Sequence, residues 1–307
     1  MQPEIAQSIF TMMLNTSFAL VIGSLASSFL LSNERNQNWL IKERLAWATK
    51  LGIALCVAST LLSLWQTSAT MGDVPLLESG PTLWRMFAVT HYGSVGLVSV
   101  GLLIVSGLST AAINRRQPNS AAIIICLIAL ALYALCRVSV SHAYESGFIS
   151  IAVLVEWVHL VAMGMWVGLV LTAAWIVLPM LRSTKASYVN TVMYLSSLST
   201  WATFVLLAIL ATGFYNGFRV LNTPRDLVAT QYGWILVVKL VFVALAIALG
   251  GWNRFYGFPK ASTSARLENW YASLLPATVV LQIESIALLI VLAAAAVLTG
   301  SAPPASM

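Results

Sequence analysis

Residues 150–180 read SIAVLVEWVHLVAMGMWVGLVLTAAWIVLPM. The only ionisable side chains in this stretch are Glu156 and His159. A transmembrane helix needs about 20 mostly apolar residues, so the stretch is long enough to cross a bilayer and to tilt or project beyond it. Ionisable side chains are costly at membrane depth, so both residues are expected to have a function.

The rest of the chain has the same character. It is 59% hydrophobic and 8% charged, whereas soluble domains carry about 25% charged residues. We therefore predict an all-α, polytopic membrane protein, with residues 1–307 forming one transmembrane domain. Eight stretches are long and apolar enough to span, at roughly residues 5–31, 45–66, 84–110, 119–141, 150–180, 191–216, 232–252 and 277–300.

The charged residues predict the topology. Most loop Lys and Arg residues fall on one set of alternate loops, and only Arg85, Arg219 and Arg225 fall on the other. The positive-inside rule places the basic loops in the cytoplasm and both termini in the periplasm. The net charge of +6 does not indicate nucleic-acid binding, because the basic residues are scattered and form no stripe.

One helix face of residues 150–180 carries a candidate metal site. Glu156, His159, Met163 and Trp166 are spaced i, i+3, i+7 and i+10, which places them on one face of a helix. Imidazole, carboxylate and thioether together favour copper, either Cu(I) or Cu(II). The alternative is a helix-packing histidine with its glutamate partner, since polar residues hold transmembrane helices together.

Two further histidines are candidate ligands. If the third span begins near Trp84, His91 lies about 10 Å below the outer surface, which is the depth of Glu156 and His159. His142 lies at the outer rim, where it would capture metal or remain a solvated side chain.

Other polar and sulfur residues are predicted to support the site. Three methionines, Met12, Met13 and Met86, lie in the outer parts of their spans and would either pack or loosely capture metal. Arg137 and Lys239 lie inside spans, where they would neutralise Glu156 or extend toward the interface. Glu284 is expected on the inner half, as an exit-side carboxylate or, as we favour, a helix-packing residue.

Several segments resemble the CopD/PcoD family of copper-resistance membrane proteins. EWVHLVAMGMWVGLV, residues 156–170, resembles the family segment in which a His is followed by Trp-x-Gly. SHA, residues 141–143, resembles the family's Gly-His-Ala with Ser in place of Gly. Residues 232–254 match a pattern of Tyr-Gly, Lys and Asn-Arg, and TGSAPP, residues 299–304, resembles the closing Pro pair.

This resemblance implies a multi-pass protein of the bacterial inner membrane. It implies copper transport, usually import, beside a periplasmic CopC-like copper carrier. By motif match it carries roles over to His142, His159 and Trp166.

Two alternatives remain open beside copper transport. His91 and His159, if equally deep, would suit a b-type haem as axial ligands in a membrane redox protein. The chain would otherwise be a docking platform for a periplasmic copper carrier, without transport. We do not expect an enzyme, and no GxxxxGK[ST] motif for a nucleotide is present.

Overall fold

The computed structural model describes residues 3–31, 39–112, 120–141, 147, 150–183, 188–221, 223–263 and 270–301. Within these ranges the regular secondary structure is helical, without strands. Eight helices are long and apolar enough to cross a membrane, which confirms the predicted number of spans. These are α1 (Pro3–Leu30), α2 (Trp39–Gly72), α4 (His91–Ala112), α5 (Ser120–Val138), α6 (Ile151–Thr172), α8 (Tyr188–Val220), α10 (Gln231–Trp252) and α12 (Leu274–Thr299).

Shorter elements extend or precede these helices. They are η1 (Leu76–Glu78), α3 (Gly80–Val89), η3 (Ala173–Val177), α7 (Leu178–Ser183), α9 (Asp226–Ala229), η4 (Asn253–Gly257), α11 (Phe258–Thr263) and η6 (Trp270–Ser273).

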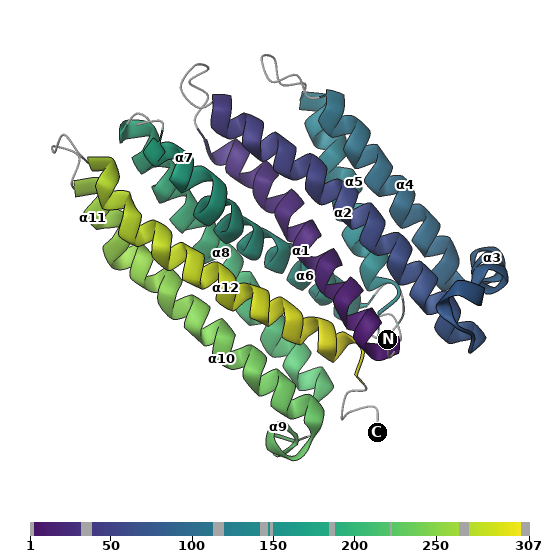
Figure 1. Cartoon of the computed structure of the whole chain (residues 1–307). Coiled ribbons are helices and arrows are strands. Elements are labelled where there is room, and N and C mark those ends of the chain that lie inside the picture. The colour runs from purple at the N-terminus through teal and green to yellow at the C-terminus, as the bar shows by residue number, and fades with distance from the viewer. Residues whose placement is uncertain are drawn as a thin grey trace.

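The long helices form one bundle with α1 near its middle (Figure 1). Helix α1 packs against α2, α6 and α12, so it joins the first half of the chain to the second. Helix α1 begins and α12 ends at the same end of the bundle, where α3 and α9 also lie. The charge pattern predicts that this end faces the periplasm.

Glycines allow α1 and α6 to cross at close range. A Cβ atom added to Gly168 would lie 2.0 Å from the carbonyl oxygen of Ala19 and 2.7 Å from the nitrogen of Gly23. Beyond the crossing, the hydroxyls of Ser27 and Thr172 are hydrogen-bonded at 2.7 Å. Small residues and polar bonds of this kind are a common way of packing helices in membranes. The crossing therefore fixes which face of α6 meets the other helices.

The third span begins later than the sequence suggested. Thr90 has extended backbone, and its hydroxyl accepts a hydrogen bond from the amide of Gly93 at 3.0 Å, which caps the start of α4. Gly93 packs so closely on α3 that a Cβ atom there would lie 2.1 Å from the carbonyl oxygen of Met86. The predicted start near Trp84 was therefore wrong, and His91 is the first residue of α4.

The same device starts α10. The Thr230 hydroxyl accepts from the amide of Gly233 at 2.9 Å, and a Cβ atom on Gly233 would lie 2.1 Å from the carbonyl oxygen of Asp226 in α9. The sequences THYG, residues 90–93, and TQYG, residues 230–233, thus encode the same turn between a short helix and a long one.

Two of the long helices end in a π-helical turn. In η3 the amide of Leu178 donates to the carbonyl of Ala173, five residues back. Pro179 follows at the second position of α7, and a proline ring clashes with the carbonyl four residues before it, which disturbs the α-helical pattern at this point. Helix α10 ends in the same way. The π-helical turn η4 follows it, and the next helix, α11, has Pro259 at its second position.

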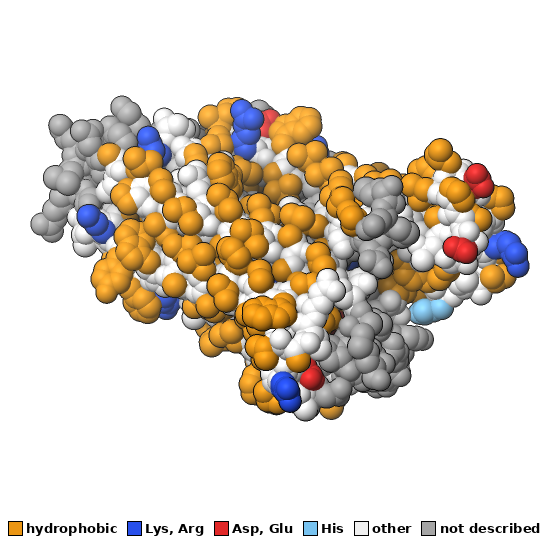
Figure 2. Space-filling view, turned by 60° about the horizontal axis from the view of Figure 1, so that its bottom comes forward, with side chains coloured by type: hydrophobic (Ala, Val, Ile, Leu, Met, Phe, Trp, Pro, Cys, Tyr) orange, Lys and Arg blue, Asp and Glu red, His pale blue; other side chains and the backbone are white. Residues whose placement is uncertain are grey.

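The outer surface of the bundle is apolar. Many large side chains on the long helices are exposed, among them Phe29, Leu108 and Phe204. Figure 2 shows one face covered largely by hydrophobic side chains, with Lys and Arg toward its margins. Such a surface fits a protein surrounded by lipid.

Candidate metal site

Helix α6 directs its polar residues toward α8. The hydroxyl of Ser150 accepts from the amide of Val153 at 3.3 Å and caps the helix, so Glu156 and His159 lie about 8 and 12 Å from its start. The amide of Asn216 donates to Glu156 Oε2 at 2.6 Å. Nδ1 of His159 lies 2.8 Å from the hydroxyl of Thr212. The two helices are antiparallel. Asn216 therefore meets Glu156, and Thr212, one turn earlier on α8, meets His159, one turn later on α6.

The hydrogen bonds of Thr212 fix the tautomer of His159. The threonine hydroxyl has one hydrogen, and it donates to the carbonyl of Ala208 at 2.6 Å. Its oxygen must then accept from Nδ1–H of His159, which leaves the lone pair of a neutral ring on Nε2. An imidazole held in this way through its other nitrogen is typical of metal-ligating histidines. Gly213 keeps the ring edge open, since a Cβ atom there would lie 3.5 Å from His159 Cε1.

Positive groups surround Glu156. Lys239 on α10 has the largest electrostatic effect on the carboxylate, followed among the cations by Arg219 and Arg137. Lys239 also acts on His159. The structure therefore brings together Glu156, His159, Lys239 and Arg137 from three different spans, at the depth predicted for Lys239 and the α6 pair.

Arg137 is anchored to α1 as well. Its Nη2 donates to Asn15 Oδ1 at 2.5 Å, and its guanidinium lies 5.9 Å from the centre of the Phe18 ring. These contacts tie α5 to α1 beside the candidate site, in keeping with a role in holding the bundle together.

The remaining residues of the α6 face point farther into the bundle. Met163 is half-buried and packs against the main core cluster. Trp166 is 5% exposed, and its indole lies beside the carboxylate of Glu284 on α12. Glu284 was expected to pack helices together. It does contact a neighbouring helix, yet its second oxygen, Oε2, is buried without a partner among the described residues.

The structure does not bring His91 to this site. As the first residue of α4, its side chain is exposed, and Nε2 lies 3.3 Å from the carbonyl oxygen of Ser139 at the end of α5. The predicted depth of about 10 Å below the surface was wrong, because Thr90 ends α3 and starts a new helix. The equal depth that a haem between His91 and His159 requires is therefore not found.

The three other candidate methionines lie on α3 and α1. Met86 is buried and packed where α3 meets α4. On α1, Met12 is half-buried and Met13 is 39% exposed. His142 lies outside the described residues. Within those residues, no group of three or more His, Cys, Asp or Glu side chains could hold a metal ion. A site at Glu156 and His159 would need donors of another kind, such as Met163.

Sequence analysis missed the partners on α8. Thr212 and Asn216 are polar, four residues apart and inside a predicted span, which is the spacing of one helix face. That spacing, together with the depth of α6, could have identified them.

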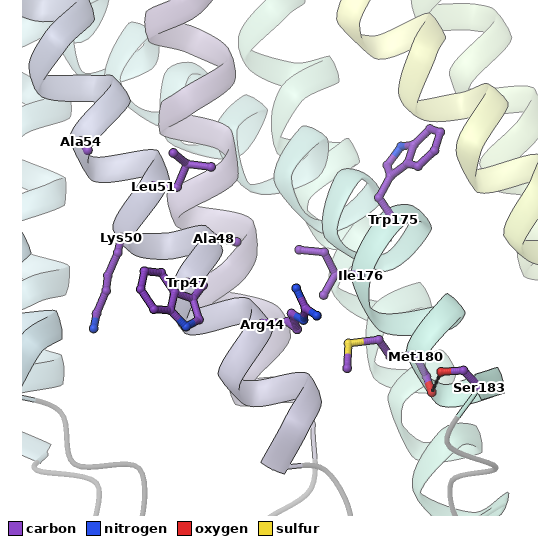
Figure 3. Close-up of a pocket in the computed structure, with 10 residues that line it drawn as sticks. All are labelled: Arg44, Trp47, Ala48, Lys50, Leu51, Ala54, Trp175, Ile176, Met180 and Ser183. Atoms are coloured by element: carbon purple, nitrogen blue, oxygen red, sulfur yellow. Dashed lines mark hydrogen bonds between the residues drawn. The ribbon is translucent and has the colours of Figure 1, made fainter.

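A groove of about 860 Å³ lies elsewhere, between α2 and the η3–α7 segment (Figure 3). Its apolar walls are formed by Trp47, Leu51, Ile176 and Met180. Arg44 also lines the groove, in the first turns of α2. None of the candidate ligands lines this groove.

Comparison with protein families gave two matches. The model described as copper resistance protein D matches residues 192–298, and the model described as copper resistance protein D-like, N-terminal domain, matches residues 2–150. Glu156, His159, Met163 and Trp166 fall between the two matched ranges, whereas Thr212, Asn216, Lys239 and Glu284 fall within the first. Comparison with curated proteins and with solved structures gave no match. With both family models matched and eight membrane-crossing helices, the chain belongs to the copper resistance protein D family and is a multi-pass protein of the bacterial inner membrane.

Proposed function

We propose that this protein transports copper across the inner membrane, inward, and that the ion binds between α6 and α8 on its way. One observation carries the proposal. A carboxylate and an imidazole lie one turn apart on a membrane-crossing helix, and the ring is held so that Nε2 keeps its lone pair. Membership of a copper-resistance family makes copper the expected ion. The inward direction follows from the resemblance alone.

The charges favour Cu(I) as the transported ion. Lys239 and Glu156 interact electrostatically, so part of the negative charge of the carboxylate is already balanced. A second cation at this depth is repelled by Lys239, and the repulsion of Cu(I) is half that of Cu(II) at equal distance. Met163 lies one turn farther along the same face, and its soft thioether also selects Cu(I).

Copper would arrive at the end of the bundle where α6 begins. His142 precedes α6 in the sequence and is proposed as the capture residue, receiving copper from a periplasmic CopC-like carrier. A docking platform without transport would share this step, so the two functions differ only in whether copper crosses the membrane.

Replacing His159 tests the proposal. Purified protein in liposomes is supplied with radioactive Cu(I), and uptake and bound copper per chain are both measured. His159→Ala should lose both, because it removes a ligand from a site of few donors. His91→Ala is the matched control, since it removes an exposed histidine at the start of α4, and it should retain both.

Three results would argue against the proposal. Unchanged uptake by His159→Ala would refute the site. Copper binding without uptake in the native protein would favour the docking platform. A Soret band in the absorption spectrum of the purified protein would favour haem.

A further inference from the structure

Glu284 is a buried carboxylate near the middle of the membrane. It lies ten residues from the start of α12, or about 15 Å along the helix, and it is 2% exposed. The Trp166 indole lies beside its carboxylate, and Oε2 has no hydrogen-bond partner among the described residues.

Asn253 repeats this pattern on the neighbouring helix. It lies in the π-helical turn η4 and is 1% exposed. Its amide nitrogen donates to the carbonyl of Ala277 on α12 at 3.3 Å, while Oδ1 is also buried without a partner in the described part of the chain. Gly250 lies one turn before Asn253, and a Cβ atom there would lie 3.2 Å from Glu284 Oε1. The Glu284 carboxylate therefore faces α10 at Gly250, whereas Asn253 Oδ1 faces Gly257, one turn beyond Asn253, where an added Cβ atom would lie 2.5 Å from it.

Two buried acceptor oxygens require a donor or a cation. Carboxylate and amide oxygens are hard ligands, which makes them poor partners for Cu(I). A proton meets the requirement most simply, because it turns one carboxylate oxygen into a donor and removes a charge that is costly in this environment.

Charged and titratable groups lie on several of the elements that pack on α12. Arg254, the nearest cation in sequence to Asn253, bonds Ser199 and Thr203 on α8. The other charged or titratable groups with described side chains on the elements packed on α12 are Glu156 and His159 on α6, Tyr232 and Lys239 on α10, Arg182 on α7, Tyr256 on η4 and Lys260 on α11.

We propose that Glu284 is a proton-binding site and that copper crosses the membrane in exchange for this proton. The exchange rests on the proposed function, whereas the proton site does not. Trp166 is seven residues beyond His159 on α6, which separates the two sites by about 10 Å. Two unit charges at that distance, with an effective dielectric of about 20, repel enough to weaken proton binding roughly tenfold. The carboxyl O–H bond breaks, the proton passes to water, and no electron is transferred.

Infrared spectroscopy of the reconstituted protein tests the proton site without copper. The native protein should show the C=O stretching band of a protonated carboxylic acid, which Glu284→Gln should lose. Glu78→Gln, at an exposed residue of η1, should keep it. Absence of the band from the native protein, or its persistence in Glu284→Gln, overturns the site.

Transport into liposomes tests the exchange. Radioactive copper uptake is measured together with the lumenal pH, reported by an enclosed dye. Copper entry should make the lumen more alkaline in the native protein. Glu284→Gln should still bind copper, yet its uptake should cause no pH change and should not respond to an imposed pH gradient. Glu284→Asp should restore both.

The outcomes separate the two claims. Copper uptake by the native protein without alkalinisation overturns the exchange and leaves the transport function standing. A full pH change in Glu284→Gln also overturns the exchange. Absence of copper uptake by the native protein refutes transport and exchange together, and the infrared band then decides the proton site alone.

Discussion

Replacing Gly168 with alanine should weaken the contact between α1 and α6. The new Cβ atom would lie 2.0 Å from the carbonyl oxygen of Ala19, and ordinary contact begins at 3.4 Å, so the two backbones must separate by 1.4 Å. Overpacking costs about 1–3 kcal/mol. Separation also breaks the Ser27–Thr172 hydrogen bond, worth about 1 kcal/mol, whereas alanine gains about 1 kcal/mol in helix propensity. The expected net loss is about 1–3 kcal/mol.

The assay is reversible unfolding in mixed micelles titrated with a denaturing detergent, followed by circular dichroism. Gly101→Ala on α4 is the matched control, because a Cβ atom at Gly101 has no neighbour within 4 Å. The control should gain up to about 1 kcal/mol. Equal stability of the two variants would show that the helices do not cross at Gly168 as described.

Three predictions concern the candidate metal site. Thr212→Val removes the hydrogen-bond partner of His159 Nδ1 and should lower copper affinity about 10- to 100-fold. The affinity is measured by equilibrium competition with a chelator. Thr200→Val, on the same helix, is the control and should leave the affinity unchanged. Met163→Leu should lower Cu(I) affinity roughly tenfold and leave Cu(II) affinity unchanged in the same assay, and an equal loss of both would exclude a thioether ligand. Asn216→Leu removes the 2.6 Å bond to Glu156 and should lower copper affinity by roughly tenfold; unchanged affinity would mean that the position of the carboxylate does not matter for binding.

The sequence predicted the layout of the spans and one side of the site. Long apolar stretches identify membrane helices reliably, so all eight spans were found. The depths expected for Glu156, His159 and Lys239 were counted from the predicted starts of their helices. The structure starts α6 and α10 within a residue or two of those positions. Depth alone placed Lys239 at the level of Glu156, and neutralising Glu156 was one of the two roles expected for it.

The rest depended on local hydrogen bonds and on which helices meet. His91 was misplaced because the Thr90 cap, which ends one helix and starts another, is short and lies inside an apolar stretch. The contact of α6 with α8 decides that Thr212 holds His159, and hydropathy carries no information about helix neighbours. Packing was favoured for Glu284 for the same reason, since only the fold shows that one of its oxygens has no partner among the described residues.

The two π-helical turns limit how α12 can move. From η3, the Trp175 indole donates to the Ser285 hydroxyl at 3.0 Å, and the carbonyl of Ala174 accepts from Gln282 at 3.5 Å. From η4, Asn253 bonds the α12 backbone on the other side. A conformational cycle in which α12 slides alone must break all three bonds. A cycle in which α6, α10 and α12 rock as a rigid unit against α2, α4 and α5 keeps these three hydrogen bonds. The glycine crossing of α1 and α6 is then the pivot of the motion.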